Sequence, residues 1–272
     1  MFDRELAERA GANLEQVRRS RPLVHNITNF VVMNCTANAL LAIGASPVMA
    51  HAKDEVEEMV ALAGALVLNI GTLSLEWIDS MIRAGKRANE LEIPIILDPV
   101  GSGATSMRTA SAKRLIRELS IRVIRGNGSE VLSLAESGAG TKGVDSVHGV
   151  DEAKEAAGEL ARELGTTLAI TGAVDLVTDG RRQLRVHNGH ELMQSVTGTG
   201  CTATAIIGAF LAVDKDPVRA TATALAYFGL AGEKAAEKAD GPGSYQVALL
   251  DALYKITPGH LIEGARIQKE PD

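Results

Sequence analysis

Short apolar runs alternate with longer helical segments along the chain, and this alternation limits the possible folds more than any other feature. Each run ends in or beside Gly, Pro, Asn or His. The runs are 45–50, 65–71, 93–100, 121–127 and 166–172, and the helical segments are 36–44, 54–64, 74–90, 111–120 and 151–165. Strands this apolar need cover on both faces, so the pattern predicts a mostly parallel sheet between helical layers.

The pattern changes after Gly172. Residues 174–189 predict two strands around the turn Asp179-Gly180, which is a hairpin signal. From Cys201 to about Tyr254 the chain is typical of consecutive helices. Since no Pro/Ser-rich linker, low-complexity segment or internal repeat interrupts the sequence, we expect a single domain over residues 1–272.

Charge and cysteine content exclude several classes of partner. The net charge is −6 and no Lys/Arg cluster is present, which argues against nucleic acid. No apolar run approaches the roughly 20 residues of a membrane span, and the charged, helical segment 1–20 does not resemble a signal peptide. Cys35 and Cys201 are far apart and fit a reducing compartment, so we expect a cytoplasmic protein.

In open α/β sheets, ligands bind beyond the carboxyl ends of the strands. This rule selects the strand-end residues before any family is considered. They are Met49, Gly71, Asp98, Arg125, Asn127 and Thr171. We expect the glycine-rich elbow Gly198-Thr199-Gly200 to join them at the same edge.

The elbow runs directly into Cys201 and an apolar helix. Consecutive N–H groups at a helix N-terminus form an anion site, although a plain strand-to-helix turn explains the same pattern. Residues 198–203 also match the dinucleotide fingerprint, but the chain continues as helix where that fingerprint expects a strand. The P-loop pattern is absent from the sequence, as are CxxC and HExxH, so a P-loop and a zinc site are excluded.

Two acidic residues follow predicted strands. Asp98 is well placed to hold a metal ion through water, and a loop-anchoring or helix-capping role is an equal alternative. Asn127 and Glu130 on their own fit an imperfect capping box better than a ligand site. Both acidic residues share one sheet edge with Arg125, and this combination favours Mg²⁺ and phosphate.

The segment 25–29, HNITN, precedes an apolar helix and suits recognition of a small polar molecule. Thr28 or Asn29 as a simple N-cap is the alternative. A helix N-terminus lowers the pKa of a thiol, so we expect a lowered pKa at Cys201, which makes its activation reasonable. A cysteine nucleophile would need a histidine base, and nothing in the sequence brings His187 or His190 to it.

Six ordered motifs together resemble the hydroxyethylthiazole kinase family of the ribokinase-like superfamily, over about residues 14–265. They are HNITNFVVMNCTAN, ASPVMAH, ILDPVGSGATSMR, RGNGSE, AITGAVDLVTDG and VTGTGC. The resemblance implies a ribokinase-like three-layer α/β/α fold with a mostly parallel central sheet and no lid domain. It also implies a homotrimer with active sites at subunit interfaces.

The resemblance further implies phosphorylation of 4-methyl-5-(2-hydroxyethyl)thiazole by ATP and Mg²⁺, in thiamine salvage. It assigns roles to residues by motif. Substrate binding falls to Met49, Gly198, Asn26 and Gly71; ATP binding to Arg125, Thr171 and Asn127; metal binding to Asp98 and Glu130; catalysis to Cys201, Gly200 and Thr199. In related sugar kinases the elbow ends in a general-base aspartate, and Cys201 stands at that position. We expect the N–H groups of about 199–201 to contribute more than the sulfur.

Three other functions stay open on the sequence alone. One is a related kinase that acts on another small alcohol or a pyrimidine, although the apolar segment 45–50 favours a heteroaromatic substrate. Another is an ADP-forming dehydratase on the same type of scaffold, which should carry an aspartate where Cys201 stands. The last is a non-catalytic nucleotide-binding protein.

Overall fold

The computed structural model describes residues 1–135 and 150–270, and the strands of this part form one nine-stranded sheet. In sheet order they are β2 (Ser46–Val48), β1 (Leu23–Ile27), β3 (Ala65–Asn69), β4 (Ile95–Asp98), β5 (Val123–Gly126), β6 (Thr167–Ile170), β7 (Asp175–Thr178), β8 (Gln183–Val186) and β9 (Ile267–Lys269). Neighbours from β2 to β6 pair in parallel, and β7, β8 and β9 continue the sheet antiparallel.

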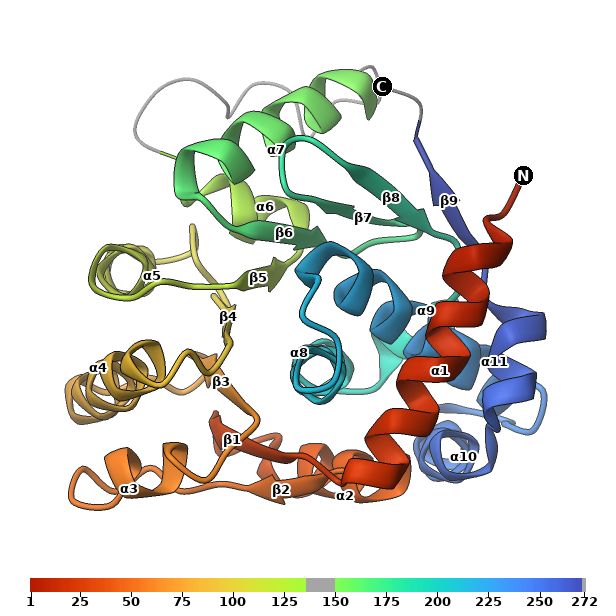
Figure 1. Ribbon diagram of the computed structural model, residues 1–272, viewed down its shortest axis with the longest axis horizontal. Helices are drawn as coiled ribbons and strands as arrows, with labels where there is room; N and C mark the ends of the chain where they lie inside the picture. The colour runs from red at the N-terminus through yellow and green to blue at the C-terminus, as the bar shows by residue number, and fades with distance from the viewer. Residues whose placement is uncertain (136–149, 271–272) are drawn as a thin grey trace.

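Helices cover both faces of the parallel strands (Figure 1). The helices are α1 (Arg4–Ser20), α2 (Met33–Ile43), α3 (Val56–Val60), α4 (Leu75–Glu90), α5 (Ser106–Glu118), α6 (Gly128–Leu132), α7 (Val150–Leu164), α8 (Thr199–Leu211), α9 (Pro217–Ala236), α10 (Pro242–Lys255) and α11 (Pro258–Gly264), with a 3₁₀ turn η1 (Glu191–Ser195). Helices α3, α4 and α5 lie on one side of the sheet, and α8, α9 and α1 lie on the other. The expected three-layer α/β/α architecture is confirmed, and no second sheet forms a lid within the described residues.

Two strands, β1 and β9, were not predicted from the sequence. Strand β1 was expected as a polar segment ahead of a helix, but it is fully inside the sheet between β2 and β3. Its apolar run is broken by His25 and Asn26, both buried, which hid the strand pattern. Strand β9 is only three residues long and carries Gln268 and Lys269. It extends the antiparallel end of the sheet by pairing with β8.

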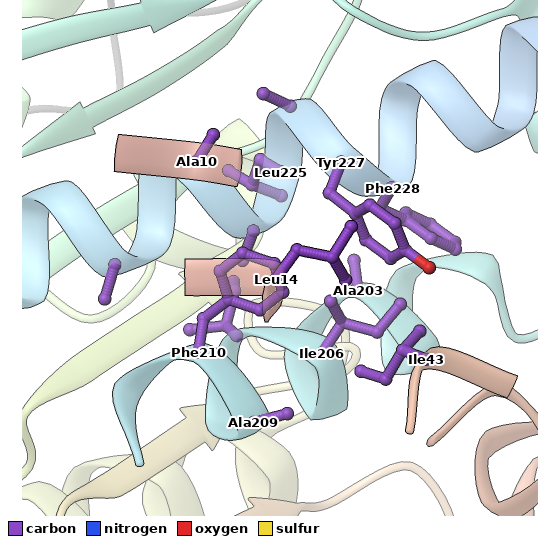
Figure 2. Packing of buried hydrophobic residues seen from close by; sticks show 14 of the residues in the cluster. Ala10, Leu14, Ile43, Ala203, Ile206, Ala209, Phe210, Leu225, Tyr227 and Phe228 are labelled. Carbon is purple, nitrogen blue, oxygen red and sulfur yellow. The ribbon is translucent and has the colours of Figure 1, made fainter. Parts of the chain in front are cut away.

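The sheet separates two apolar cores. One core lies under α3, α4 and α5 and contains Trp77 and Met81. The larger core lies between the sheet and helices α1, α8, α9 and α10. Figure 2 shows part of it, with Leu14 of α1 beside Phe210 and Ile206 of α8. Among the described helices, none is both long and apolar enough to cross a lipid bilayer.

Helices distant in sequence close the structure at one end. Helix α1 packs against α11 so closely that a Cβ on Gly11 would lie 2.5 Å from Cγ1 of Ile262. The backbone N–H of Asp3 donates to the carbonyl of Ile267 at 2.7 Å. Lys269 of β9 forms an ion pair with Asp3 at 2.8 Å. The segment before β1 therefore depends on segments after α10 for its packing.

Helix α8 crosses the middle of the sheet and is buried on all sides after its first turn. It contacts β1, β3 and β4. A Cβ on Gly208 would lie 3.1 Å from Cγ2 of Val67 and 3.2 Å from Cγ1 of Val24. A glycine therefore lets α8 lie close on the strands, and this approach sets where the start of the helix meets the sheet edge.

We predict that Gly208→Leu destabilises the protein, because the new side chain must displace Val24 and Val67 in a close-packed core. Overpacking of this kind costs about 1–3 kcal/mol or more of unfolding free energy. The matched control is Gly243→Leu, a helical glycine in α10 with nothing within 4 Å of its added Cβ. Urea unfolding of both variants checks the prediction, and equal midpoints would contradict it.

Candidate active site

The parallel strands bring their last residues to one edge of the sheet. The register pairs Asn69 at the end of β3 with Asp98 at the end of β4. Arg125 is the second-last residue of β5. The last residue, Gly126, pairs with Ile170 of β6, and Thr171 directly follows Ile170. Helix α8 starts over this edge, as the strand-end rule predicted.

Asp98 is completely buried at the centre of this edge. Its Oδ2 accepts hydrogen bonds from Nδ2 of Asn69 at 3.0 Å and from Oγ1 of Thr204 at 2.8 Å. Nη1 of Arg125 lies 3.7 Å from the same oxygen. Burial raises the pKa of Asp98 to about 6, and Arg125, Thr204 and Asn69 act against that rise. Its Oδ1 is buried and has no hydrogen-bond partner among the residues that the structure describes.

The guanidinium of Arg125 connects Asp98 to the start of α8. Its Nη2 donates to Oγ1 of Thr171 at 2.5 Å. A Cβ on Gly200 would lie 2.6 Å from Nη1 of Arg125, so the guanidinium rests directly against this glycine. The sequence prediction that the elbow joins the strand ends is confirmed by this contact.

The elbow has the geometry of a helix start, and its first N–H groups have no intrahelical partner within the described residues. Gly198 caps α8 in the left-handed region, at φ +85°, where a side chain is strained. The first intrahelical bond runs from Thr202 N–H to the carbonyl of Gly198 at 2.8 Å. The N–H groups of residues 199–201 precede that bond, and N–H groups at such a helix start can bind an anion. The hydroxyl of Thr199 instead donates back to the carbonyl of Met193 at 2.9 Å.

Cys201 lies in the first turn of α8 and is half-buried. Nδ2 of Asn29 donates to its Sγ at 3.5 Å. Burial and the nearby Asp98 raise the pKa of the Cys201 thiol to about 11, against the opposing effects of Asn69, Asn29 and Arg125. The expectation that the helix N-terminus lowers this pKa was wrong, because the loss of solvent outweighs the helix dipole. The thiol is protonated at neutral pH.

Asn127 and Glu130 form the capping box that the sequence allowed as an alternative. Asn127 caps α6 by accepting from the N–H of Glu130 at 2.9 Å, and Glu130 Oε2 accepts from the N–H of Asn127 at 2.9 Å. Oε1 of Glu130 also accepts from the N–H of Gly101 at 2.8 Å. The capping role is thus confirmed, and it anchors the loop after β4 beside Asp98.

The residues expected to bind the acceptor lie along the β1–β3 part of the edge. The N–H of Gly71 donates to Oδ1 of Asn69 at 3.0 Å, and a Cβ here would lie 2.6 Å from Nδ2 of Asn29. Asn26 is buried, and its Nδ2 donates at 2.9 Å to the carbonyl of Val24 in its own strand. Met49 follows β2 and is half-buried. Arg125 contacts both Asp98 and Gly200, whereas no contact between Met49 and these three residues is seen in the described part.

A cleft of about 540 Å³ opens on the other side of Arg125. Apolar side chains from α8, α9 and η1 line it, together with polar groups at the Arg125 end. The lining includes Arg125, Asn127, Thr171, Asp175, Asn188, His190, Met193, Thr199, Gly200, Ala203, Leu225 and Phe228. Its apolar wall and polar end suit a flat heterocycle that carries an anionic group.

Sequence reasoning missed several residues of this site. Asn69 ends an apolar strand, so the rule that selected Asp98 should have selected it too. Asn29 was considered as an N-cap, but Val32 is the cap residue of α2 and makes no side-chain cap bond. Thr204 carried no signal within an apolar helix. Asp175 is the first residue of β7. Burial raises its pKa to about 6, although the N–H of Gly172 and the charge of Arg125 lower it.

Comparisons with known proteins find relatives along almost the whole chain. The sequence model of the hydroxyethylthiazole kinase family matches residues 14–259. The hydroxyethylthiazole kinase of Desulfotalea psychrophila is 64% identical over 260 residues, which cover 96% of this chain and 95% of that protein. The structure of the hydroxyethylthiazole kinase of Pyrococcus horikoshii superposes with a TM-score of 0.88 at 50% identity, covering 96% of this chain and 99% of that one.

A more distant structure supports the fold alone. A ribokinase-like superfamily protein from Enterococcus faecalis superposes with a TM-score of 0.66 at 14% identity. It covers 94% of this chain and 96% of its own. The ribokinase-like fold predicted from the sequence is therefore confirmed.

We predict that Asp98→Asn stabilises the protein near neutral pH. The folded-state pKa of about 6 lies above the ordinary 3.8, so the contribution of Asp98 to stability falls as pH rises through about 6. Replacing the carboxylate should raise the unfolding free energy by about 1–3 kcal/mol near pH 8 and by less near pH 4.5, where Asp98 is protonated. Denaturant unfolding at both pH values measures this.

Asp214→Asn is the control with the opposite sign. Despite burial, Arg219 and Asn13 hold the pKa of the Asp214 carboxyl below its usual range. Its ionised form is therefore stabilising, and Asp214→Asn should weaken the protein near pH 8. Loss of stability in Asp98→Asn near pH 8 would contradict the prediction for Asp98.

Proposed function

The chain belongs to the hydroxyethylthiazole kinase family, and we propose that it transfers the γ-phosphoryl group of ATP to the hydroxyl of 4-methyl-5-(2-hydroxyethyl)thiazole. The products are 4-methyl-5-(2-phosphooxyethyl)thiazole and ADP, a step of thiamine salvage. The observation that carries this proposal is the guanidinium of Arg125, held against Gly200 between Asp98 and Thr171. It puts a fixed positive charge beside the free N–H groups of α8.

The cleft beyond Arg125 is proposed as the ATP site. The adenine ring would lie among Met193, Leu225 and Phe228, and the phosphates would extend toward Arg125 and Thr171. Asn127 lines the same cleft at its polar end. This orientation puts the γ-phosphate at the start of α8, where a helix N-terminus stabilises anionic charge.

The acceptor side is proposed to lie between the elbow and strands β1 to β3. A Cβ on Gly198 would lie 2.9 Å from Cγ1 of Val32 and 3.1 Å from Sγ of Cys35, so the elbow faces an apolar part of α2. With Met49, these groups form a surface suited to a thiazole ring. A substrate-binding role for Asn26 and Gly71 stays a prediction. The substrate hydroxyl would then approach Cys201 from the side opposite the cleft.

The reaction needs positioning and charge stabilisation more than covalent chemistry. The bond from the γ-phosphorus to the bridging oxygen of ADP breaks as the bond to the substrate oxygen forms, and the hydroxyl proton passes to water. The N–H groups of residues 199–201 and Arg125 would stabilise the charge on the transferred group. Because the thiol of Cys201 is protonated at neutral pH, it would donate or orient rather than accept a proton at the start of the reaction.

The residues at the edge fit Mg²⁺ bound largely through water and phosphates. Within the described part of the chain, Oδ1 of Asp98 is buried without a hydrogen-bond partner, and Glu130 is close enough to raise the pKa of Asp98. Among the described residues, no group of three or more acidic, His or Cys side chains is arranged to hold a metal ion. Mg²⁺ needs only one or two carboxylates beside phosphate. Asp98 and Glu130 would hold the ion, whose charge would neutralise the phosphates during transfer.

We propose the homotrimer that the family resemblance implies, and the described residues expose two different apolar patches that could form its interface. One patch, formed by Phe30, Val31 and Leu75, lies at the acceptor end of the sheet edge, and Phe30 is 64% exposed. The other is formed by Leu41 of α2 with Val247, Leu250 and Tyr254 of α10, and Tyr254 is 72% exposed. A three-fold ring needs one surface to bind a different one on the next copy. Pairing these patches would cover the acceptor site with a neighbouring subunit.

Two further expectations stay predictions: one domain over the whole chain and a cytoplasmic location. Both follow from the sequence. The single sheet and the two free thiols of Cys35 and Cys201 are compatible with them.

We predict that the protein releases ADP from Mg-ATP when hydroxyethylthiazole is added, and much less with hydroxymethylpyrimidine or ribose. An apolar acceptor surface around Met49 and Val32 gives this preference. A coupled ADP-release assay with the three alcohols measures it. Activity on ribose or the pyrimidine but not the thiazole would assign another substrate, and ATP binding without any stimulated release would refute the kinase.

We predict that Cys201→Ala keeps measurable turnover and that Cys201→Asp matches or exceeds the wild type. A thiol whose pKa is about 11 supplies little base at neutral pH, and a carboxylate restores a base at that position. Between about pH 7 and 9, kcat of the wild type and of Cys201→Ala should change in parallel. Complete loss of turnover in a folded Cys201→Ala variant would show that the sulfur is indispensable.

A further inference from the structure

Asn69 uses both ends of its side chain in the site. Its Nδ2 donates to Oδ2 of Asp98 at 3.0 Å. Its Oδ1 accepts from Nδ2 of Asn29 at 2.9 Å and from the N–H of Gly71 at 3.0 Å. Nδ2 of Asn29 also reaches Sγ of Cys201 at 3.5 Å. Asn69 is therefore the link in a continuous chain of hydrogen bonds from the carboxylate of Asp98 to the thiol of Cys201.

The orientation of this amide is fixed by its surroundings. The backbone N–H of Gly71 can only donate, so the side-chain atom of Asn69 that faces it must be the oxygen. The nitrogen must then face Asp98. Because Asn69 is buried, neither end can exchange its partner for water. The amide thus fixes Asp98 with one end and the loop carrying Asn29 with the other.

The linked groups come from separate parts of the chain. Asp98 ends β4, Asn29 lies in the loop after β1, and Cys201 lies in α8. Asp98 lies beside Arg125, which lines the cleft proposed for ATP. Asn29 and Gly71 lie on the side proposed for the acceptor. A shift of about 1 Å between such groups is enough to lower a transfer rate strongly.

We propose that Asn69 is a positioning residue for phosphoryl transfer, which holds the carboxylate of Asp98 and the Asn29–Cys201 pair in register across the two halves of the site. The inference rests on the proposed kinase function. Asn69 does not touch either substrate in this scheme. It acts on the rate of transfer by fixing groups that do.

The chain contains a matched buried asparagine away from the site. Asn13 of α1 is buried, and its Nδ2 donates to Oδ2 of Asp214 at 3.0 Å and to Oγ1 of Thr223 at 3.1 Å. Like Asn69, it therefore joins a buried aspartate to a second element. Its removal tests what the loss of such an amide does to the fold alone.

The experiment compares Asn69→Ala with Asn13→Ala in steady-state kinetics and thermal unfolding. Both variants should lose stability. Asn69→Ala should also lower kcat by about 10- to 100-fold, the usual effect of losing a group that orients site residues. Its KM values for ATP and the thiazole alcohol should stay within about threefold of wild type, because ground-state contacts are kept. Asn13→Ala should keep kcat.

Asn69→Asp supplies a second, nearly isosteric variant. It keeps oxygens for Gly71 and Asn29, but its ionised form, favoured by assays above about pH 8, cannot donate to Asp98 and adds a like charge beside it. Its kcat should fall at least as far as that of Asn69→Ala. If Asn69→Ala does not fold, this variant decides the question by the same criteria.

A double-mutant cycle with Asn29→Ala tests the link itself. If Asn69 acts partly through Asn29, the double variant should lose less kcat than the product of the two single losses. A kcat within twofold of wild type in folded Asn69 variants, strict multiplication in the cycle, or an equal kcat loss in Asn13→Ala would each overturn the inference. A wild type with no kinase activity on any alcohol would instead refute the proposed function.

Discussion

The buried carboxylate of Asp98 is the constraint on which the rest of the site depends. A buried charge is costly unless hydrogen bonds and an opposite charge compensate it. Here Asn69 and Thr204 donate to one oxygen and Arg125 lies nearby, yet burial still keeps the pKa at about 6. Each partner comes from a different element, so compensating this one group brings β3, β4, β5 and α8 together. The other oxygen is buried and has no hydrogen-bond partner among the described residues.

The sheet and much of its functional edge could be predicted from the sequence. Apolar runs separated by helices specify parallel strands, and parallel strands put Asp98, Arg125 and Thr171 at one edge. Strand β1 was missed because His25 and Asn26 interrupt its apolar run. The link between Asn29 and Asn69 could not be read, since it joins residues 40 positions apart through a register that only the folded sheet defines. The pKa of Cys201 was predicted in the wrong direction, because burial depends on how α8 packs.

Glu130 combines a helix-capping role with a place in the candidate site. Its carboxylate closes the capping box of α6 and also binds the N–H of Gly101, in the loop that follows Asp98. The capping alternative and the site alternative were treated as competitors in the sequence. In the folded protein the cap is what brings the carboxylate to the site. The same side chain orders two loops and contributes negative charge near Asp98.

The contact between α1 and α11 has a consequence for how the chain folds during synthesis. The apolar face of α1 is made early, but Ile262 and the strand that binds Asp3 emerge from the ribosome much later. Until then Leu6, Ala10 and Leu14 lack part of their cover, and such exposed surface is open to aggregation or to chaperones. Closure of this end is therefore a late event, and slow synthesis beyond α10 prolongs the period in which the nascent chain needs protection.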